Sequence, residues 1–326
     1  MTDASAPAAP SAPLVAIVTP VYNGSEFLAE TMDCVQRQTY PNLVHVVLDN
    51  ASTDATPEIL ARYRNLKVPV VTARNPSLLS MDENWNASLK LVPAEAKYFR
   101  ILCADDVIFP DATTQMVAQF EADPKVMVVT SAVMRNEVRE DFKWPKDRTV
   151  FEGREALQRY FTIQGTIEAR QMMLRTASLR QDDPFFDLRS GHSSDIDAAL
   201  RMLTRGRLGF VHEPLAMVRE HPGNASQSEM RPLYMHFHDW LTILKRYGPN
   251  AFGDAYRKLE RRYVRFYTRK MLIWRFIKGN HRAFTTHMDL LKQDGASPGL
   301  LEFADAAFDL VLKRLGLREG WYSYPY

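Results

Sequence analysis

The stretch LVAIVTPVYNGSEFLAETMDCVQRQTYPNLVHVVLDNASTDAT, residues 14–56, decides the fold class. It opens with a short apolar run rich in β-branched residues, continues with apolar residues at helical spacing, and returns to a second apolar run at 42–49. Strands with nearly continuous apolar sequence, joined by a helix, are typical of a parallel sheet that is covered on both faces. The second run ends in DNASTD, a cluster of turn-forming residues.

The same alternation continues to about residue 136. We expect strands at 14–20, 42–49, 68–73, 97–102 and 125–134, and helices at 23–38, 56–63, 80–91 and 110–123. This order predicts a doubly wound, mostly parallel α/β sheet with helices on both faces. In such sheets ligands bind beyond the carboxyl ends of the strands, where this chain carries its polar clusters.

The regions outside the alternation complete the predicted organisation. Residues 1–13 are rich in Ala, Pro and Ser and lack the features of a signal peptide, so we predict a disordered tail. A sheet domain is expected over 14–228, with two short strands flanking His212–Pro214 near its end. Residues 229–326 are predicted to form an all-helical C-terminal region.

Composition narrows the class of protein. With 326 residues, 46% hydrophobic and 25% charged, the chain is typical of a globular protein with a sizeable core. A net charge of +2 gives no general reason to expect a nucleic-acid partner. Only two cysteines occur, Cys34 and Cys103, which indicates a reducing, cytoplasmic setting. No apolar run reaches the ~18–20 residues of a spanning helix.

The stretch ILCADDVIFP, residues 101–110, places Asp105 and Asp106 directly after an apolar strand. Two adjacent ionised carboxylates repel, and burial increases that cost. Either the pair lies in a solvated turn, or a cation lies beside it. Neither GxGxxG nor a P-loop sequence is present, so the common dinucleotide and NTPase sites are not indicated.

Four fragments carry a resemblance to a known family. They are VAIVTPVYNGSEFLAETMDCVQRQTYPNLVHVVLDNASTDAT, NWNASL, ILCADD and SSDIDAALRMLTRGRLGFVHEPLAMVREHPGNAS. In this order and spacing they closely resemble the inverting family 2 glycosyltransferases, which have the GT-A fold. The resemblance implies an enzyme that moves a sugar from a nucleotide-diphosphate donor, with a UDP-sugar favoured, to an acceptor hydroxyl. It does not extend to the C-terminal third.

The resemblance also implies a divalent metal, Mn²⁺ or Mg²⁺. Such hard ions prefer carboxylate oxygens and stabilise a leaving diphosphate. Asp106 matches the metal-binding position, Asp105 is expected at the ribose or at the water shell of the metal, and His221 matches a histidine that completes the site in several relatives. Many relatives read D-x-D-D, whereas Cys103 occupies the first position here. A scheme with three carboxylates therefore does not transfer.

The donor-binding positions follow from the same resemblance. Asp49 matches the position that accepts the base N–H of uridine, although capping the DNASTD turn is an ordinary alternative for this residue type. Two further groups are implied at the donor: Thr19, Pro20, Tyr22 and Asn23 under the base and ribose, and Asn84 and Asn86 at the start of a helix. The two asparagines have an equally good structural interpretation on the helix surface.

Asp195 is the implied catalytic base. Inverting transfer needs one carboxylate that takes the proton of the attacking hydroxyl. Relatives commonly have Glu-Asp here, and this chain has Ser194-Asp195. Asp197, two residues on, is expected to face away from the neighbours of Asp195. The alternative for Asp195 is an ordinary acidic residue at a helix N-terminus.

The changes at Cys103 and Ser194 leave a second function open, a GT-A-like protein that binds nucleotide or glycan without catalysis. A nucleotidyltransferase is a more distant third.

The segment YRKLERRYVRFYTRKMLIWRFIKGNHR, residues 256–282, holds ten Lys/Arg and the single acidic residue Glu260. A basic helix with aromatic residues either packs its aromatic stripe on the catalytic domain or attaches to a membrane surface. Nucleic acid is not expected, because no binding motif accompanies the charge. We therefore expect a cytoplasmic protein, with peripheral contact at the inner face of the membrane as an option, and a glycan or lipid-linked acceptor in surface polysaccharide assembly.

Overall fold

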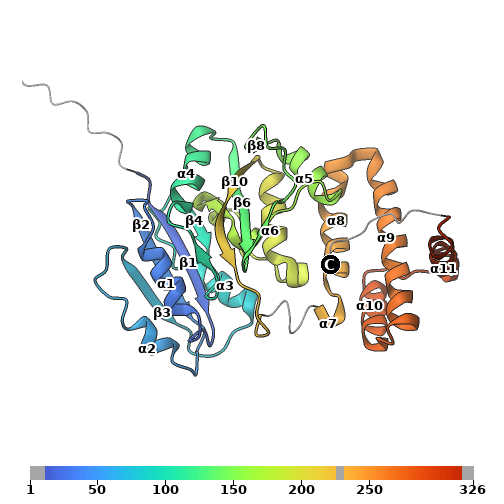
Figure 1. Ribbon diagram of the computed structural model, residues 1–326, viewed down its shortest axis with the longest axis horizontal. Helices are drawn as coiled ribbons and strands as arrows, with labels where there is room; N and C mark the ends of the chain where they lie inside the picture. Colours follow the sequence, from blue (N-terminus) through green and yellow to red (C-terminus); the bar gives the residue numbers. More distant parts are fainter. Residues whose placement is uncertain (1–11, 225–230, 318–326) are drawn as a thin grey trace, which may run out of the picture. The chain divides into compact units, whose positions relative to one another are not determined.

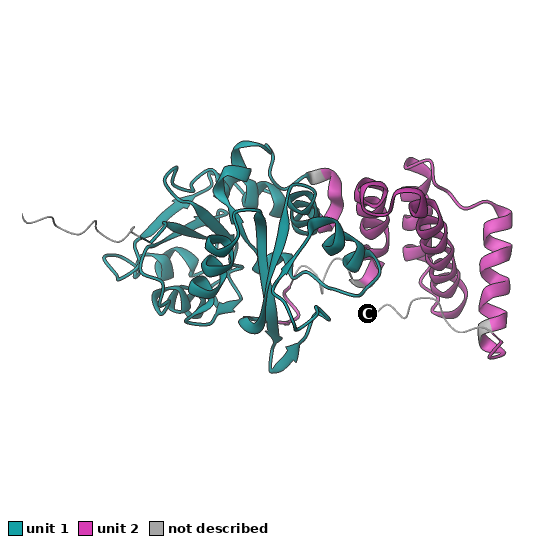
Figure 2. Cartoon of the chain, turned by 90° about the horizontal axis from the view of Figure 1, so that it is seen from above, with its two compact units in different colours: residues 1–188, 194–219 teal, residues 189–193, 220–326 magenta. Residues whose placement is uncertain are grey.

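The structure, a computed structural model, describes residues 12–224 and 231–317. The chain divides into two compact units, drawn in different colours in Figure 2. The sheet unit comprises residues up to 188 together with 194–219, and the helical unit comprises 189–193 together with the residues from 220 onward. The predicted boundary after residue 228 and nearly all of the predicted tail 1–13 lie outside the described residues.

Within the described residues the sheet unit contains one mixed sheet of ten strands, in the order β3-β2-β1-β4-β9-β6-β10-β5, with β7 paired to β6 and β8 to β10. The strands are β1 Val15–Val21, β2 Leu43–Asp49, β3 Val70–Arg74, β4 Tyr98–Ile101, β5 Val107–Ile108, β6 Val126–Arg135, β7 Val138–Glu140, β8 Val150–Phe151, β9 Met173–Arg175 and β10 Arg207–Val218. Strands β3, β2, β1 and β4 are parallel, as the alternation predicts. Their carboxyl ends therefore meet at one edge.

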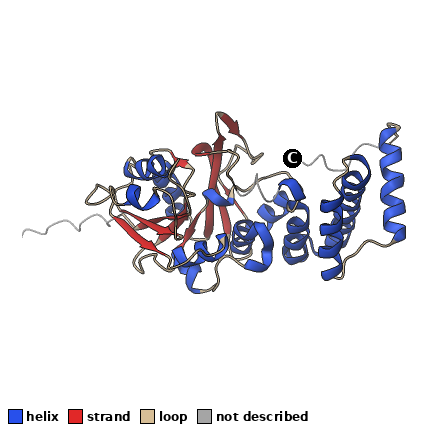
Figure 3. Ribbon diagram, turned by 90° about the horizontal axis from the view of Figure 1, so that it is seen from below, coloured by secondary structure: helices blue, strands red, loops and turns tan. Residues whose placement is uncertain are grey.

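Helices lie on both sides of this sheet (Figure 3), which confirms the predicted α/β fold class. They are α1 Leu28–Gln36, α2 Thr56–Leu60, α3 Met81–Leu89, α4 Ala112–Ala122, α5 Gly153–Phe161 and α6 Ser194–Leu203, together with the short 3₁₀ segments η1 Ala169–Gln171, η2 Thr176–Arg180 and η3 Leu188–Ser193. Helix α3 begins with the expected capping box of Ser80 and Glu83. Val21 and Val47 pack against Leu28 and Met32 in the core between sheet and helices.

Two features of the sheet differ from the prediction. The two short strands expected around His212–Pro214 are one long strand, β10, whose register with β6 shifts between Val211 and Pro214. The residues His212–Pro214, which suggested a break between two strands, therefore lie in a β-bulge of one strand. The second feature is β9, which pairs antiparallel with both β4 and β6. Its three residues are too few to give a periodic signal.

The helical unit is built around aromatic side chains. Its helices are α7 Arg231–Leu233, α8 His236–Phe252, α9 Tyr256–Leu272, α10 His281–Gln293 and α11 Leu300–Arg314, with the short segments η5 Gly253–Ala255 and η6 Ile273–Ile277 (Figure 1). Tyr263 of α9 packs on Trp240 of α8 at a ring distance of 3.9 Å, and Tyr267 packs on Phe237 at 5.7 Å. Among the described residues, no helix is both long and apolar enough to cross a membrane.

Candidate active site

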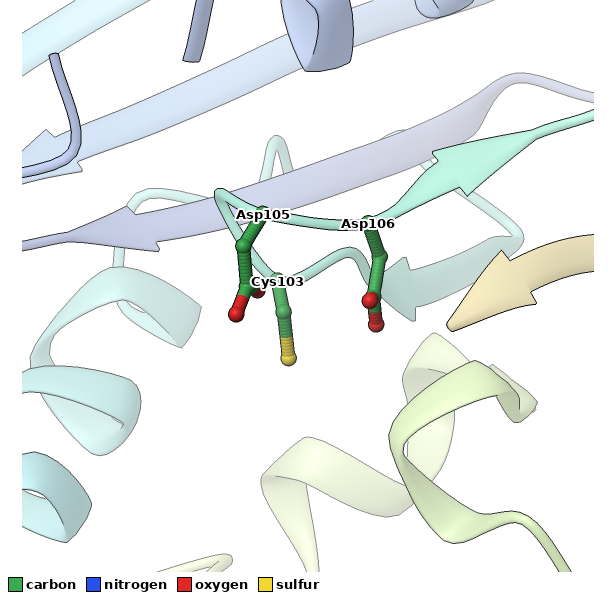
Figure 4. A group of neighbouring side chains, drawn as sticks. All are labelled: Cys103, Asp105 and Asp106. Atoms are coloured by element: carbon green, nitrogen blue, oxygen red, sulfur yellow. The ribbon is translucent and has the colours of Figure 1, made fainter. Parts of the chain in front are cut away.

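The loop that follows β4 brings together three potential ligand atoms. The thiol of Cys103 and the carboxylates of Asp105 and Asp106 lie within 4.8 Å of one another. Figure 4 shows the three side chains pointing to the same side of this loop. Asp106 is 2% exposed, whereas Cys103 and Asp105 are partly buried. The pair of aspartates is therefore not a solvated turn.

Neighbouring groups hold the Asp106 carboxylate in one orientation. Its Oδ1 accepts the backbone N–H of Arg219 at 2.9 Å, and its Oδ2 accepts the side-chain amide of Gln171 at 2.8 Å. The amide oxygen of Gln171 in turn accepts from the fully buried guanidinium of Arg100 at 2.8 Å. Each carboxylate oxygen keeps a lone pair beyond the hydrogen bond it already accepts. Asp106 is therefore positioned and can still bind a cation.

Burial and neighbouring acidic groups dominate the electrostatics of this loop. Burial, followed by the charge of Asp105, raises the pKa of Asp106 to about 7, and the Arg170 guanidinium opposes the shift. Burial also raises the pKa of the Cys103 thiol well above its usual value, with Asp106 and Asp105 adding to the effect. Cys103 is thus a neutral thiol at pH 7. The hard donors of the group are the two carboxylates, which suit Mg²⁺ or Mn²⁺.

Asp195 lies in the first turn of α6. Its charge adds to the raised pKa of the Cys103 thiol, and Arg170 lowers the pKa of both Asp195 and Asp106, so these acidic groups act on one another electrostatically. Burial raises the pKa of Asp195 to about 6, opposed by the Arg170 guanidinium and by a 2.7 Å hydrogen bond from the backbone N–H of Ile196. A carboxylate with this pKa is a stronger base than an exposed aspartate and is mostly ionised at pH 7.

The residues around Asp195 take other roles. Ser194, which replaces the expected glutamate, donates its hydroxyl to Asp82 at 2.5 Å. Asp197 is fully buried and pairs with Arg201 at 3.3 Å. Asp195 differs from these two neighbours because its carboxylate accepts a hydrogen bond from the helix backbone, the N–H of Ile196. This arrangement leaves its carboxylate suited to accept a proton.

Asp49 ends β2 and is engaged on both of its oxygens. Its Oδ1 accepts the backbone N–H of Ser52 at 2.9 Å, which is the predicted capping role in the DNASTD turn. Its Oδ2 forms an ion pair with Arg74, at the end of β3, and that guanidinium also donates to the Ser52 carbonyl at 2.8 Å. Arg74 was not among the site residues predicted from the sequence. Asp49 and Arg74 together present a carboxylate beside a guanidinium at the sheet edge.

The residues at the end of β1 that were predicted to bind the sugar donor differ in their exposure to solvent. Tyr22 is 48% exposed, whereas Thr19 and Pro20 are buried. The Thr19 hydroxyl bonds the ring of His45 at 2.9 Å within the sheet. Asn23 has a φ of 48° and its side chain accepts the backbone N–H of Thr53 at 2.9 Å. Asn23 therefore ties the loops after β1 and β2 together, and Thr19 supports the sheet beneath them.

Asn84 and Asn86 of α3 are both used by neighbouring protein groups. Asn84 is buried and accepts from Asn75 at 2.9 Å. Asn86 forms a reciprocal pair with the backbone of Phe186, donating to its carbonyl and accepting its N–H, each at 2.9 Å. These contacts favour the structural interpretation of both residues.

His221 belongs to the helical unit, two residues beyond the end of the sheet unit. Its backbone N–H donates to the side chain of Asn224 at 2.6 Å. Its role as a metal ligand stays a prediction. Arg219 pairs with Glu30 at 2.7 Å and donates to the Asp105 carbonyl at 3.0 Å, so its side chain braces the loop that carries the aspartates.

The polar segment around η1 was not predicted from the sequence. Buried Glu168 pairs with Arg170 at 2.9 Å and with Arg135 at 3.1 Å, and Gln171 reaches Asp106. Arg170 lowers the pKa of both Asp106 and Asp195, so it contributes positive charge to both carboxylates. A contact between residues 65 positions apart has no local periodicity that could reveal it.

Comparison with known proteins agrees with the geometry. The family model described as glycosyl transferase family 2 matches residues 16–180, half of the chain. The chain therefore belongs to glycosyltransferase family 2. An uncharacterized glycosyltransferase of Rickettsia prowazekii is 24% identical over 243 residues, which cover 72% of each protein. The abequosyltransferase RfbV of Salmonella typhimurium is 34% identical over 102 residues, which cover 30% of each.

Solved structures show the same architecture. The chain matches TarS of S. aureus, residues 1–349 in complex with UDP-GlcNAc, with a TM-score of 0.70 and 15% identity over 96% of this chain and 95% of that one. It also matches the mannosyltransferase PcManGT of Pyrobaculum calidifontis, in complex with GDP-Man and Mn²⁺, with a TM-score of 0.52 and 17% identity over 95% and 82%. The protein is thus a glycosyltransferase with the GT-A fold, as the sequence resemblance implies.

Proposed function

We propose that the protein transfers a sugar from a nucleotide-diphosphate donor to an acceptor hydroxyl, with inversion at the anomeric carbon and with help from a divalent cation. The observation that carries this proposal is the group of Asp105 and Asp106 at the carboxyl end of β4, together with Asp195 in the first turn of α6, whose charge acts on the Cys103 thiol of that group. Such a group supplies both requirements of the reaction, a place for a cation beside a diphosphate and a base for the acceptor. This proposal assigns the cation to Asp105 and Asp106 and the proton transfer to Asp195.

Asp105 and Asp106 would hold the cation, which, when bound, stabilises the negative charge that develops on the leaving diphosphate. Gln171 and the backbone N–H of Arg219 keep the Asp106 carboxylate in orientation, and the Cys103 thiol is neutral beside it. Asp195 takes the proton from the acceptor hydroxyl as the oxygen attacks the anomeric carbon. Arg170 supports the ionised form of Asp195 at pH 7.

We infer that the donor carries uridine. A uracil ring presents an N–H donor beside a carbonyl acceptor, and the Asp49 carboxylate and Arg74 guanidinium at the sheet edge present the complementary acceptor and donors. TarS, in the structures that match this chain, is in complex with UDP-GlcNAc or UDP, and PcManGT is in complex with GDP-Man. Guanine also has an N–H next to a carbonyl, so a GDP-sugar is the donor to compare first.

We infer that the acceptor belongs to bacterial surface polysaccharide assembly and that the reaction takes place in the cytoplasm. This inference is supported by relatives such as the putative teichuronic acid biosynthesis glycosyltransferase TuaG of Bacillus subtilis, 29% identical over 98 residues. The two cysteines, one buried and one partly buried, are both free, as a reducing compartment would keep them.

Asp195→Asn tests the proposed base. Because the amide cannot take the proton, release of UDP from a UDP-sugar in the presence of acceptor extract should fall by about 10²–10⁴. The variant should still bind UDP with Mn²⁺, since Asp195 is assigned to the acceptor. The matched control is Glu58→Gln, which changes an exposed carboxylate on α2 and should leave the rate unchanged. Turnover by Asp195→Asn at the control rate would remove Asp195 from the chemistry.

A further inference from the structure

Helix α11 packs through Ala306, Asp309 and the partly buried Phe303, and it exposes a row of apolar side chains. Asp305 pairs with Arg265 of α9 at 2.8 Å, and Asp309 pairs with Arg269 at 2.7 Å and with Arg265 at 3.6 Å. Asp309 is 7% exposed, in contact with α9. A surface helix normally does the reverse, burying its apolar stripe and turning charges to water. The orientation of α11 therefore needs a separate explanation.

The exposed side of α11 forms one continuous apolar surface, which we call the α11 apolar face. Leu301, Phe308 and Val311 are 83%, 60% and 54% exposed. Steps of three and four residues place the members of this face on one side of the helix. They are Leu300, Leu301, Ala304, Ala307, Phe308, Val311 and Leu315, all exposed. A contiguous apolar surface of this kind marks an interaction site.

Two further large apolar residues, which follow the end of α9, are exposed. Both ion pairs between α9 and α11 join residues 40 positions apart, Arg265 with Asp305 and Arg269 with Asp309, so the two neighbouring helices run parallel. Phe276 and Ile277, just after the end of α9, are 76% and 70% exposed. In this parallel register they come level with the C-terminal end of α11.

The segment that contains the neighbouring helix α9 is strongly basic, whereas α11 itself carries Glu302, Asp305 and Asp309. Segment 256–282 has ten Lys/Arg and one acidic residue, and only two of those cations form the pairs described here with α11. The following basic residues of the segment are exposed: Arg257, Lys258, Arg261, Arg262, Lys278 and Arg282. An anionic lipid surface is complementary to such a combination of an apolar face and a neighbouring basic segment. A second copy of the chain would instead bring two basic surfaces together.

We propose that α11 is the membrane-binding element of this protein, and that its apolar face lies in the interface of an anionic lipid bilayer. Phe276 and Ile277 enter the same interface, and the basic residues of 256–282 bind lipid phosphates. The sequence left two alternatives for 256–282, packing of its aromatic stripe on the catalytic domain or attachment to a membrane surface, and neither assigned the membrane contact to α11. Tyr263, Phe266 and Tyr267 are buried within the helical unit.

The test compares vesicle binding by the full chain, by one double variant and by one single control variant. Phe308→Ser/Val311→Ser removes the centre of the α11 apolar face, and the matched control Val138→Ser changes a 68% exposed apolar residue on β7. Co-sedimentation uses phosphatidylglycerol/phosphatidylethanolamine vesicles and pure phosphatidylcholine vesicles. The unmodified chain and the control should bind the anionic vesicles, more weakly at high salt, and the double variant should bind about tenfold more weakly.

The melting temperature and the UDP response of the double variant should match those of the unmodified chain, because the replaced side chains face water. Sedimentation velocity without lipid measures the oligomeric state of the unmodified chain and of the double variant. Absence of vesicle binding by the unmodified chain, equal binding to both lipid compositions, or unchanged binding by the double variant would overturn the proposal. A dimer that the double variant dissociates, without vesicle binding, would assign the α11 apolar face to a second copy instead.

Discussion

The carboxylate loop of the sheet unit and helix α11 of the helical unit depart in opposite ways from the usual placement of side chains. In the loop, charged Asp106 is buried at the end of β4. On α11, Leu301 and Phe308 are exposed while Asp309 is buried. Burying a carboxylate and exposing a row of large apolar side chains both cost free energy in an isolated chain. For each departure we propose a partner outside the chain, a cation in the first case and a lipid surface in the second.

The two regions differ in how the unusual groups are held. Asp106 is fixed by hydrogen bonds from Gln171 and the Arg219 backbone. The carboxylates of α11 are held by ion pairs with arginines. A carboxylate that is hydrogen-bonded but has no ion pair can accept a cation, whereas Asp309 already has its counter-charges. The comparison thus separates a binding site from a structural ion pair.

Gln171→Leu gives the largest of the effects expected in this comparison. The substitution removes the donor that orients Asp106 and leaves Arg100 without its amide partner, so the apparent affinity for Mn²⁺ should fall by about 10–100-fold. A Mn²⁺ titration of the UDP-dependent melting shift measures this change. Gln164→Leu, an exposed position in the same region, is the matched control. Equal Mn²⁺ affinity in both variants would show that Asp106 does not depend on Gln171 for its orientation.

Arg269→Met tests the ion-paired region. The side chains of Arg269 and Asp309 are 5% and 10% exposed, so the substitution removes the nearer of the two arginines that pair with this buried carboxylate. We expect a loss of about 2 kcal/mol in stability, less than for a fully unpaired buried charge because Arg265 remains. Thermal melting compares this variant with Arg257→Met, an exposed cation on the same helix. UDP binding should be unaffected, and a change in it would contradict the separation of roles.

The smallest expected effect is the dependence of rate on pH. The pKa of Asp195 is raised to about 6, so the carboxylate is protonated and cannot act as base as pH falls below that value. At saturating Mn²⁺, the rate should fall about tenfold for each further pH unit. Because a raised folded-state pKa means that protonation favours the fold, Asp195 itself does not cause acid unfolding in this window. A melting curve at each pH checks this, and a rate that stays constant down to pH 5 would contradict the role of Asp195.

Sequence reasoning reached the parts of the protein that depend on local pattern. The alternation of residues 14–134 predicted β1 to β4, the helices between them and the position of Asp105 and Asp106 after β4. It could not reach Arg74, Arg170 or Gln171, because their contacts with Asp49 and Asp106 join distant segments. The sequence predicted an all-helical region over 229–326, which contains α11. The orientation of α11 was not predicted, because it depends on ion pairs with α9.

The most direct test of the central claim is the melting temperature of the full chain with UDP, with Mn²⁺, and with both. The same panel uses GDP, CDP, dTDP and UMP, and is repeated for Asp106→Ala. A ligand at a hundredfold excess over its dissociation constant stabilises the native state by about 2.7 kcal/mol. We predict an upward shift that needs both UDP and Mn²⁺ and is absent in Asp106→Ala. A UDP shift of equal size without Mn²⁺, or one that persists in Asp106→Ala, would contradict a cation site at Asp105 and Asp106.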